Sequence, residues 1–448
     1  MKLLQKLFLL LIITVLIVPA FAEEGDDSGF NFEMVIELGA ETFNENGDSV
    51  SYQMLSLNPD FAFGKIGIGL AFTLHFQFDD GDGDFKFREE DWIPDSERSF
   101  LDIYLPIFRY VRYGHKGDPL YGKIGSIDDG TLGNGFIMGN YSNSHFLPEL
   151  RMVGLALDID GNLFNFPYIG IETFAGNLAK MDVFGTRIYV RPLTSLGIPI
   201  IKELQIGATA AFDREPDALY NFTSDPDDPS SVYTPDSVSI YGVDFKQPII
   251  ANNMFSLALF GDVAFQSGNS TTNTGGMVGI GGQLVSFINY GLNALFLGDN
   301  FLPFYFESVY DLYRETKYEI YDGSETVDAY SGWLASLGFT FLDGMFEFNT
   351  SLDGAFSKIT GIETTYPHLR SVLVVGEGVI PGFFFDASYD KRYIRDWPDL
   401  IDPDNAVIGA NINYKTGPAI ITLGYNLRYV PEDGSWDTTS KLSTSISF

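Results

Sequence analysis

Residues 65–78 read KIGIGLAFTLHFQF, a stretch in which large apolar side chains alternate with small or polar ones. Every even position from Ile66 to Phe78 holds Ile, Leu or Phe, whereas the odd positions from Lys65 to Gln77 hold Lys, Gly, Ala, Thr, His or Gln. A period of two is that of a β-strand, whose successive side chains point to opposite faces. The stretch therefore predicts one unbroken strand with an apolar and a polar face.

The same alternation recurs along the chain, and most of these runs are about ten to fourteen residues long, as a tilted strand needs to cross a membrane. Some twenty apolar faces, rich in Phe, Tyr and Leu, are more than one soluble core could bury, whereas a closed cylinder can turn them to lipid. We therefore predict an all-β fold, a transmembrane antiparallel up-and-down β-barrel with water inside. The clearest further runs are residues 204–213, 255–266, 276–297, 304–312, 408–415 and 421–429.

The number of strands follows less directly. The alternating runs give an inventory of about 21, but a single-chain bacterial barrel has an even number of strands. We expect 18 to 20 strands, with 16 as the alternative. The two doubtful segments are residues 119–127, which could belong to an inserted loop, and residues 276–297, where the strand boundaries are uncertain. A barrel of this size is too wide for side chains to fill.

One stretch has a competing interpretation. Residues 263–298 contain no charged side chain, and residues 277–298 are mostly apolar, which raises the question of a membrane-spanning helix. Four glycines and two asparagines between 279 and 293 make a poor helix. The apolar residues also keep to one parity there, so we predict strands.

The amino terminus has the three parts of an export signal. Lys2 and Lys6 precede an apolar run at residues 7–18, and Ala20-Phe21-Ala22 supplies small residues for cleavage. We expect cleavage after Ala22, which leaves residues 23–448 as a single barrel domain.

Connections alternate between short turns and long acidic segments such as 79–98, 214–235, 320–328 and 394–404, an asymmetry typical of outer-membrane barrels.

The composition excludes several functions. The 448 residues include 60 acidic and 27 basic side chains, giving a net charge of −33, which disfavours nucleic acid as a partner. There is no Cys and there are only four His, and no sequence motif of a hydrolase or phosphate loop occurs. We therefore expect no enzymatic activity, no catalytic residue, no cofactor and no metal.

The last strand carries the most specific pattern. Leu442, Thr444, Ile446 and Phe448 share one face, and the chain ends on an aromatic residue. This resembles the terminal assembly signal of bacterial outer-membrane β-barrel proteins, and the whole chain looks like a porin-like member of that class. The resemblance implies the bacterial outer membrane as its location. It implies contact with lipid and lipopolysaccharide, recognition of Leu442, Ile446 and Phe448 by the barrel-assembly machinery, and homo-oligomers as an option.

Charged side chains lie on the polar parity of many predicted strands, as a water-filled lumen requires. In a wide pore such groups set the local potential and so the ions that enter; alternatively, opposite charges pair across the wall and satisfy one another. The Gly-rich segment 122–140 could fold inward and narrow the pore, or it could be a plain extracellular loop. The pore-lining candidates are Lys65, His75, Arg187, Arg191, Asp244, Asp262, Glu307, Asp311, Glu347, Asp386, Asp390, Arg392 and Arg428.

The leading functional hypothesis is a channel for the passive diffusion of small hydrophilic solutes, with a preference for cations because of the excess negative charge. A hydrophobic-solute or fatty-acid channel is an alternative, although only residues 23–29 are available for an amino-terminal plug. A surface adhesin or structural barrel acting through its acidic extracellular loops is the third.

Overall fold

The strands of the chain join into one antiparallel sheet that closes on itself. The computed structural model describes residues 30–45, 48–78, 85–94, 98–147, 150–223, 231–252, 254–268, 272–285, 287–357, 367–430 and 435–447. The expected signal at 1–22 and the terminal Phe448 lie outside these residues.

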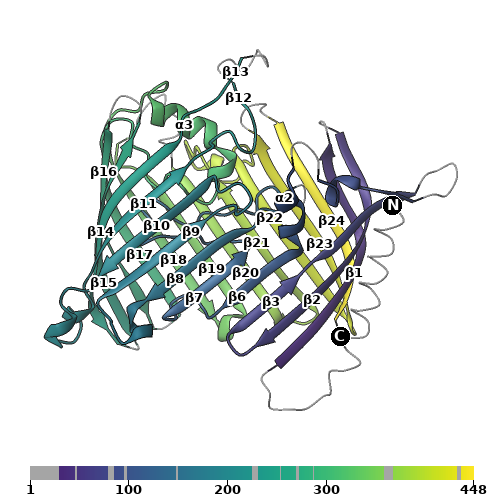
Figure 1. Cartoon of the computed structure of the whole chain (residues 1–448), viewed down its shortest axis with the longest axis horizontal. Helices are drawn as coiled ribbons and strands as arrows, with labels where there is room; N and C mark the ends of the chain where they lie inside the picture. Colours follow the sequence, from purple (N-terminus) through teal and green to yellow (C-terminus); the bar gives the residue numbers. More distant parts are fainter. Residues whose placement is uncertain are drawn as a thin grey trace.

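The barrel wall begins with β1 and ends with β24, which pair with each other from Val35–Ser447 to Glu41–Lys441 and so close the ring (Figure 1). The strands are β1 (Phe30–Glu45), β2 (Asp48–Phe63), β3 (Ile66–Leu70), β4 (Phe72–Phe78), β5 (Phe85–Phe87), β6 (Phe108–Tyr113), β7 (Leu120–Gly125), β8 (Gly154–Asp160), β9 (Ile169–Ala175), β10 (Val183–Val190), β11 (Gln205–Asp213), β12 (Phe222–Thr223), β13 (Val232–Tyr233), β14 (Val238–Ala251), β15 (Phe255–Ser267), β16 (Thr272–Leu284), β17 (Ile288–Leu297), β18 (Tyr330–Phe341), β19 (Phe346–Ala355), β20 (His368–Ile380), β21 (Phe383–Lys391), β22 (Ala406–Thr416), β23 (Ala419–Val430) and β24 (Ser435–Ser447). The helices are α2 (Phe100–Tyr104) and α3 (Arg314–Asp322), with short 3-10 turns that include η2 (Glu89–Asp91), η3 (Leu105–Ile107) and η7 (Tyr310–Leu312).

The ring has 20 strands when β3 and β4 count as one interrupted strand and β5 as a hairpin extension outside the ring. This number is the upper end of the predicted range, and the alternative of 16 is wrong. Residues 120–125 are a wall strand, so their assignment to an inserted loop is wrong too. Residues 276–297 divide at 285–287 into β16 and β17, which confirms strands there. None of the helices in the described ranges is long and apolar enough to cross a membrane.

Two predictions about strands fail for identifiable reasons. Residues 304–312 are no strand but part of the connection from β17 to β18, because both parities are aromatic there: Phe304, Tyr305 and Phe306 follow one another, which leaves no polar face. Residues 65–78 do alternate as predicted, but the strand breaks at Ala71. Below the break β3 pairs with β6, and above it β4 pairs with β5.

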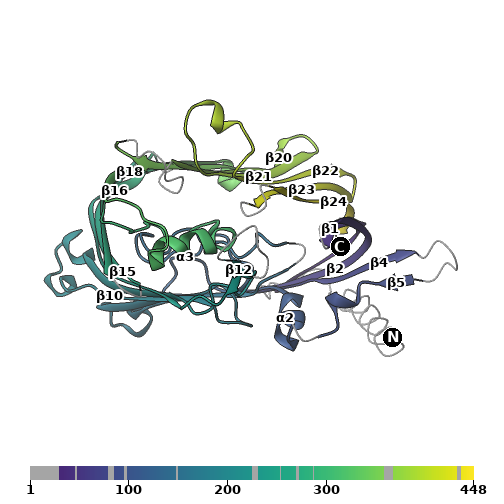
Figure 2. The same cartoon turned by 90° about the horizontal axis from the view of Figure 1, so that it is seen from above.

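The two ends of the barrel differ. The turns between β2 and β3, β18 and β19, β20 and β21, and β22 and β23 lie at the end where β1 begins and β24 ends. The long connections 126–153, 214–237 and 298–329 lie at the other end, where Figure 1 places α3 with β12 and β13. Figure 2 shows α3 inside the outline of the ring. The long connections therefore supply the material that enters the lumen.

Candidate functional site in the barrel interior

The two faces of the wall differ as the alternation predicts. Leu442 on β24 is 58% exposed and Leu292 on β17 is 56% exposed, whereas their neighbours Ser443 and Gly291 are buried. Large apolar side chains exposed at this level on strand after strand form a continuous apolar exterior, which is the surface that lipid covers in a membrane barrel. The opposite parity faces the lumen.

The Gly-rich connection between β7 and β8 enters the lumen and contacts the wall on several sides. Asn134 donates from its side-chain amide to Asp262 on β15 at 3.0 Å, and to the carbonyl of Phe245 on β14 at 3.2 Å. The backbone N–H of Gly133 donates to Glu172 on β9 at 2.8 Å. These bonds hold residues 130–141 across the interior, which corresponds to the inward-folding alternative for this segment.

A second inward segment, the connection 298–329, packs against the first. Met138 and Phe306 form a parallel bridge, and Gly139 N–H donates to the carbonyl of Phe306 at 3.0 Å. Phe136 stacks on Phe301 with ring centroids 5.6 Å apart. The two segments share an apolar core, whose buried members include Ile127, Leu132, Phe136, Met138, Tyr141, Phe301, Tyr305, Phe306, Tyr310, Tyr318 and Ile320.

Glycines on the inner face of the wall make room for this core. A Cβ at Gly275 on β16 would lie 2.4 Å from the ring of Phe301, and one at Gly242 on β14 would lie 2.7 Å from Ile137. Real Cβ atoms do not approach carbon this closely, so these wall positions admit the inward side chains only because they lack a Cβ. The small residues on the polar parity are thus contact sites for the inward segments.

A fully buried arginine ties the second segment to the wall. Arg314, the first residue of α3, contacts Asp311 at 2.7 Å, Asp182 at 2.8 Å and Asp213 at 3.2 Å, and all four side chains are fully buried. Burial alone lowers the pKa of Arg314, but the three aspartates raise it well above its usual value. The hydroxyl of Tyr141 donates to Asp311 at 2.9 Å, which links the first segment to this cluster.

A second charged cluster is centred on Glu307. Its carboxylate contacts Lys317 of α3 at 2.6 Å, His368 of β20 at 3.1 Å and Arg392. His368 also contacts Asp390 on β21 at 2.5 Å. This cluster joins the inward segment to the wall opposite β14 and β15, so the segment is anchored on both sides of the ring.

The sequence-predicted candidates occupy three kinds of place. Those on strands are His75, Arg187, Asp244, Asp262, Glu347, Asp386, Asp390 and Arg428. Glu307 and Asp311 belong to the inward segment, because residues 304–312 are not a strand; Lys65 lies in the turn after β2, and Arg191 and Arg392 directly follow β10 and β21. Leu442 and Ile446 face outward on β24.

Most of these charged candidates have a partner within the protein. Arg187 donates to Asp244 at 2.6 and 2.8 Å and to Glu172 at 2.9 Å. Arg191 contacts Asp160 at 2.5 Å, and Arg428 contacts Asp437. Lys65 contacts Asp118 at 3.0 Å. His75 lies between two carboxylates, 2.9 Å from Glu41 and 2.7 Å from Asp91. Glu347 and Asp386 accept from Asn349 and Asn411 at 2.5 and 2.9 Å. The pairing alternative therefore describes the wall well.

Sequence reasoning missed the residues that anchor the interior: Arg314, Lys317, Asp182, Asp213 and His368. Their partners come from distant connections, so no local spacing marks them. A usable signal was present around Arg314, because Arg314, Lys317, Tyr318 and Tyr321 recur at helical spacing and not at a period of two.

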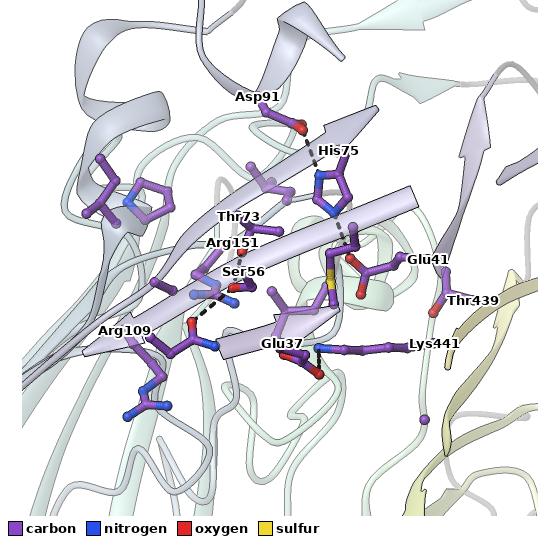
Figure 3. A pocket seen from close by; sticks show the side chains of 18 of the residues that line it. Glu37, Glu41, Ser56, Thr73, His75, Asp91, Arg109, Arg151, Thr439 and Lys441 are labelled. Atoms are coloured by element: carbon purple, nitrogen blue, oxygen red, sulfur yellow. Dashed lines mark hydrogen bonds and ion pairs between the residues drawn. The ribbon is translucent and has the colours of Figure 1, made fainter. Parts of the chain in front are cut away.

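The described residues enclose two sizeable cavities that the wall strands help to line. One, of about 670 Å³, lies between the Gly-rich segment and β14 to β20, and its lining includes Asn134, Lys246, Glu307, Asp353, His368 and Arg370. The other, of about 390 Å³, lies near β1, β2 and β4 (Figure 3), and its lining includes Glu37, Glu41, His75, Asp91, Arg151 and Lys441. Charged and polar side chains of the inner wall contribute to the lining of both cavities, together with apolar side chains.

No protein-family model and no curated protein matches the chain. Among solved structures, CdiB from Acinetobacter baumannii is 7% identical with a TM-score of 0.25, and the match covers 93% of this chain and 60% of that one. OpdQ from Pseudomonas aeruginosa is 11% identical with a TM-score of 0.31, covering 94% and 97%. OccK2 (OpdF) from the same organism is 9% identical with a TM-score of 0.33, covering 94% and 96%. Values this low carry no argument about what this chain does.

Proposed function

We propose that this barrel is an outer-membrane channel through which small hydrophilic solutes diffuse passively. The observation that carries the proposal is the cavity of about 670 Å³, lined in part by charged and polar side chains, inside a closed ring whose exterior is apolar. The inward segments narrow the lumen beside this cavity, and fixed charges line it. A constriction of this kind selects solutes by size and charge while the wall keeps them from lipid.

Cation preference is part of the proposal. The net charge of −33 concentrates cations near the protein, and this effect weakens as salt screens the charges. The paired charges of the wall contribute little net field, so the preference should come mainly from the acidic connections at the mouth.

The test is a planar-bilayer recording of the purified mature protein in a KCl gradient. We expect a stable pore with a reversal potential of the cation-selective sign, approaching zero selectivity at high salt. Anion preference would refute the cation part. Absence of any pore would refute the channel and favour a structural barrel or an adhesin, because the buried core shared by the two inward segments could then close the lumen.

We also propose that the chain is exported with cleavage after Ala22 and assembled in the bacterial outer membrane, in contact with lipid and lipopolysaccharide, as a monomer or homo-oligomer. Recognition by the barrel-assembly machinery would use Leu442, Ile446 and Phe448. Deleting Phe448 should reduce the amount of protein in the outer-membrane fraction, and unchanged assembly of that variant would contradict the role of this signal.

A further inference from the structure

The ring is interrupted in one place, above the break at Ala71. Below it, β3 pairs with β6 as far as Leu70 and Phe108. Above it, β5 pairs with Phe76–Phe78 of β4, and the N–H of Arg88 donates to the carbonyl of His75 at 3.0 Å; in the described part of the chain no strand pairs with Phe72–Leu74 on this edge. The β4–β5 hairpin instead runs away from the ring, as Figure 2 shows. The hydrogen bonding between neighbouring wall strands is therefore interrupted between β4 and β6.

The segment that covers this gap has two different faces. It runs through η2, α2 and η3, and Figure 2 places α2 on the outer side of the ring. On its outer face Phe100 is 65% exposed and Leu101 is 46% exposed. Residues further along, Ile103, Pro106 and Ile107, line the cavity of about 390 Å³. One cavity is therefore bounded by a lipid-level segment on one side and by the lumen on the other.

The lumenal side of this cavity is polar. Its lining includes Asn411 of β22, Asn426 of β23, and Thr439 and Lys441 of β24, which all face inward. The same lining also holds apolar side chains, namely Met54, Leu147 and Leu150 together with Ile103, Pro106 and Ile107. A ligand that fills the cavity thus meets both polar and apolar groups.

Among the charged side chains that line the cavity, Arg151 differs from the others in having no bonded partner among the described residues. Lys441 contacts Glu37 at 3.0 Å, His75 lies between Glu41 and Asp91, and Arg109 contacts Asp60 at 2.6 Å. Asp102 is occupied at the start of α2, where Ser99 donates to it from its hydroxyl at 2.6 Å. Arg151 is different, because no hydrogen bond or ion pair joins its side chain to another described residue.

Within the described residues, Arg151 is therefore a cation without a bonded anion. Burial, opposed by Glu41 and reinforced by Arg109, lowers the pKa of Arg151. Figure 3 shows the Arg151 side chain among the cavity residues, close to Ser56 and Thr73. A guanidinium without a partner in a partly buried site is best satisfied by an oxyanion, which accepts its forked N–H groups in a bidentate manner.

We propose that this cavity is a lateral portal that binds an amphiphilic carboxylate, with its carboxylate on Arg151 and its apolar tail against Ile103, Pro106 and Ile107, beneath the gap between β4 and β6. The portal connects the lumen to the lipid that surrounds α2. This goes beyond diffusion of hydrophilic solutes, because the ligand class and the route both differ, and it rests on the proposed membrane location alone.

The cavity size and its two-sided lining select this ligand class. A volume of about 390 Å³ is within the usual range for sites that bind small organic molecules, about 300–1,000 Å³. An inorganic anion such as phosphate would satisfy Arg151 but leave the apolar side of the cavity filled with water. An alcohol of the same chain length would fill the apolar side but leave Arg151 without its anion.

The experiment is calorimetric titration of octanoate into the full mature barrel in lipid nanodiscs, with empty nanodiscs subtracted. Arg151→Gln should weaken octanoate binding by at least about tenfold, as expected for loss of a hydrogen-bonded charge. Arg151→Lys should retain part of the affinity. The matched control is Arg395→Gln, an exposed arginine in the connection after β21, which should bind octanoate like the wild type. Acetate, inorganic phosphate and octanol should each bind at least about tenfold more weakly than octanoate.

Several results would overturn the portal. If the wild type does not bind octanoate, or if Arg151→Gln binds it as tightly as the wild type, Arg151 is not part of a carboxylate site. If acetate or phosphate binds as tightly as octanoate, the site does not require an apolar tail. Heat-modifiability on gels shows that each variant is folded. Conductance is measured separately, so that octanoate binding without a pore refutes only the diffusion channel, and a pore without octanoate binding refutes only the portal.

Discussion

The side-chain amide of Asn134 donates to the carboxylate of Asp262 at 3.0 Å, although 128 positions separate the two residues in the chain. Asn134 lies in the inward Gly-rich segment and Asp262 on the inner face of β15. At this bond a lumen-facing carboxylate of the wall holds a segment inside the ring, as Glu172 does with Gly133.

Asn134→Ala should loosen the Gly-rich segment. The change removes a hydrogen bond to a charged group and leaves Asp262 without that donor, at a cost of about 1–3 kcal/mol. We expect single-channel recordings to show more frequent transitions between conductance levels. Asn411→Ala is the matched control, since it removes an amide–carboxylate bond of 2.9 Å to Asp386 that lies entirely within the wall. Equal noise in the two variants would contradict a restraining role for Asn134.

Gly275→Ala should displace the second inward segment. The new Cβ would lie 2.4 Å from the Phe301 ring, and such overpacking costs about 1–3 kcal/mol. Gly276→Ala, the next residue on the opposite face, meets no atom closer than 3.4 Å and should be nearly neutral. Thermal unfolding in detergent, followed by calorimetry, compares the two. A midpoint for Gly275→Ala equal to that of Gly276→Ala would count against the close contact.

Arg314→Met should destabilise the interior strongly. It leaves Asp182, Asp213 and Asp311 buried without their cation, and breaking a buried ion pair by removing one partner costs about 3–5 kcal/mol. Limited proteolysis of the folded barrel should then cut the 298–329 connection faster. Arg395→Met serves as control, because that side chain is 63% exposed and should change stability little. Protease resistance equal to the wild type would show that Arg314 is no anchor.

Glu319 on α3 should make the stability of the interior depend on pH. Burial and the neighbouring Glu325, Glu315 and Asp322 raise the pKa of Glu319 to about 7, above its usual value near 4.5. Between about pH 4.5 and pH 7 the folded state therefore keeps the Glu319 proton, whereas the unfolded state loses it. The contribution of Glu319 to the free energy of unfolding falls as the pH rises through this range, and it stays low above pH 7. Solvent screening of this half-exposed group limits the effect to about 1 kcal/mol.

Glu319→Gln should remove this dependence. The variant should unfold at a higher temperature than the wild type at pH 8 and at the same temperature at pH 4.5. Thermal unfolding in the same detergent at both pH values checks this. A constant difference between the two proteins across that range would mean that Glu319 titrates as an ordinary exposed carboxylate.

The wall of the barrel could be predicted from the sequence because alternation is local. On β23, Ile421, Leu423 and Tyr425 face outward as their parity requires, and one run of residues suffices to show it. The same rule failed at residues 304–312, where Tyr305 occupies the parity that should be polar and is buried inside the ring. An interior segment is surrounded by protein on all sides, so its apolar pattern has no solvent face to give it a period.

The charged clusters could be predicted only in part, for a different reason. Asp244 and Asp262 lie on the polar parity of their strands, where they contact Arg187 and Asn134. Parity could not reveal Arg314, whose partners Asp182 and Asp213 lie more than 100 positions away and become neighbours only through the ring closure. Unpaired Arg151 had no signal either, because the absence of a partner is a property of three-dimensional packing.

The hydrogen bond from Tyr141 to Asp311 spans 170 positions and has a consequence for how fast the chain can fold. Contacts of such high sequence separation must wait until the intervening chain is ordered, and proteins dominated by them fold slowly. The first inward segment leaves β7 early in the chain but finds its main apolar partner only after β17. Until then its aromatic side chains stay uncovered, and a helper that shields them before the ring closes would shorten the most aggregation-prone period in the life of this protein.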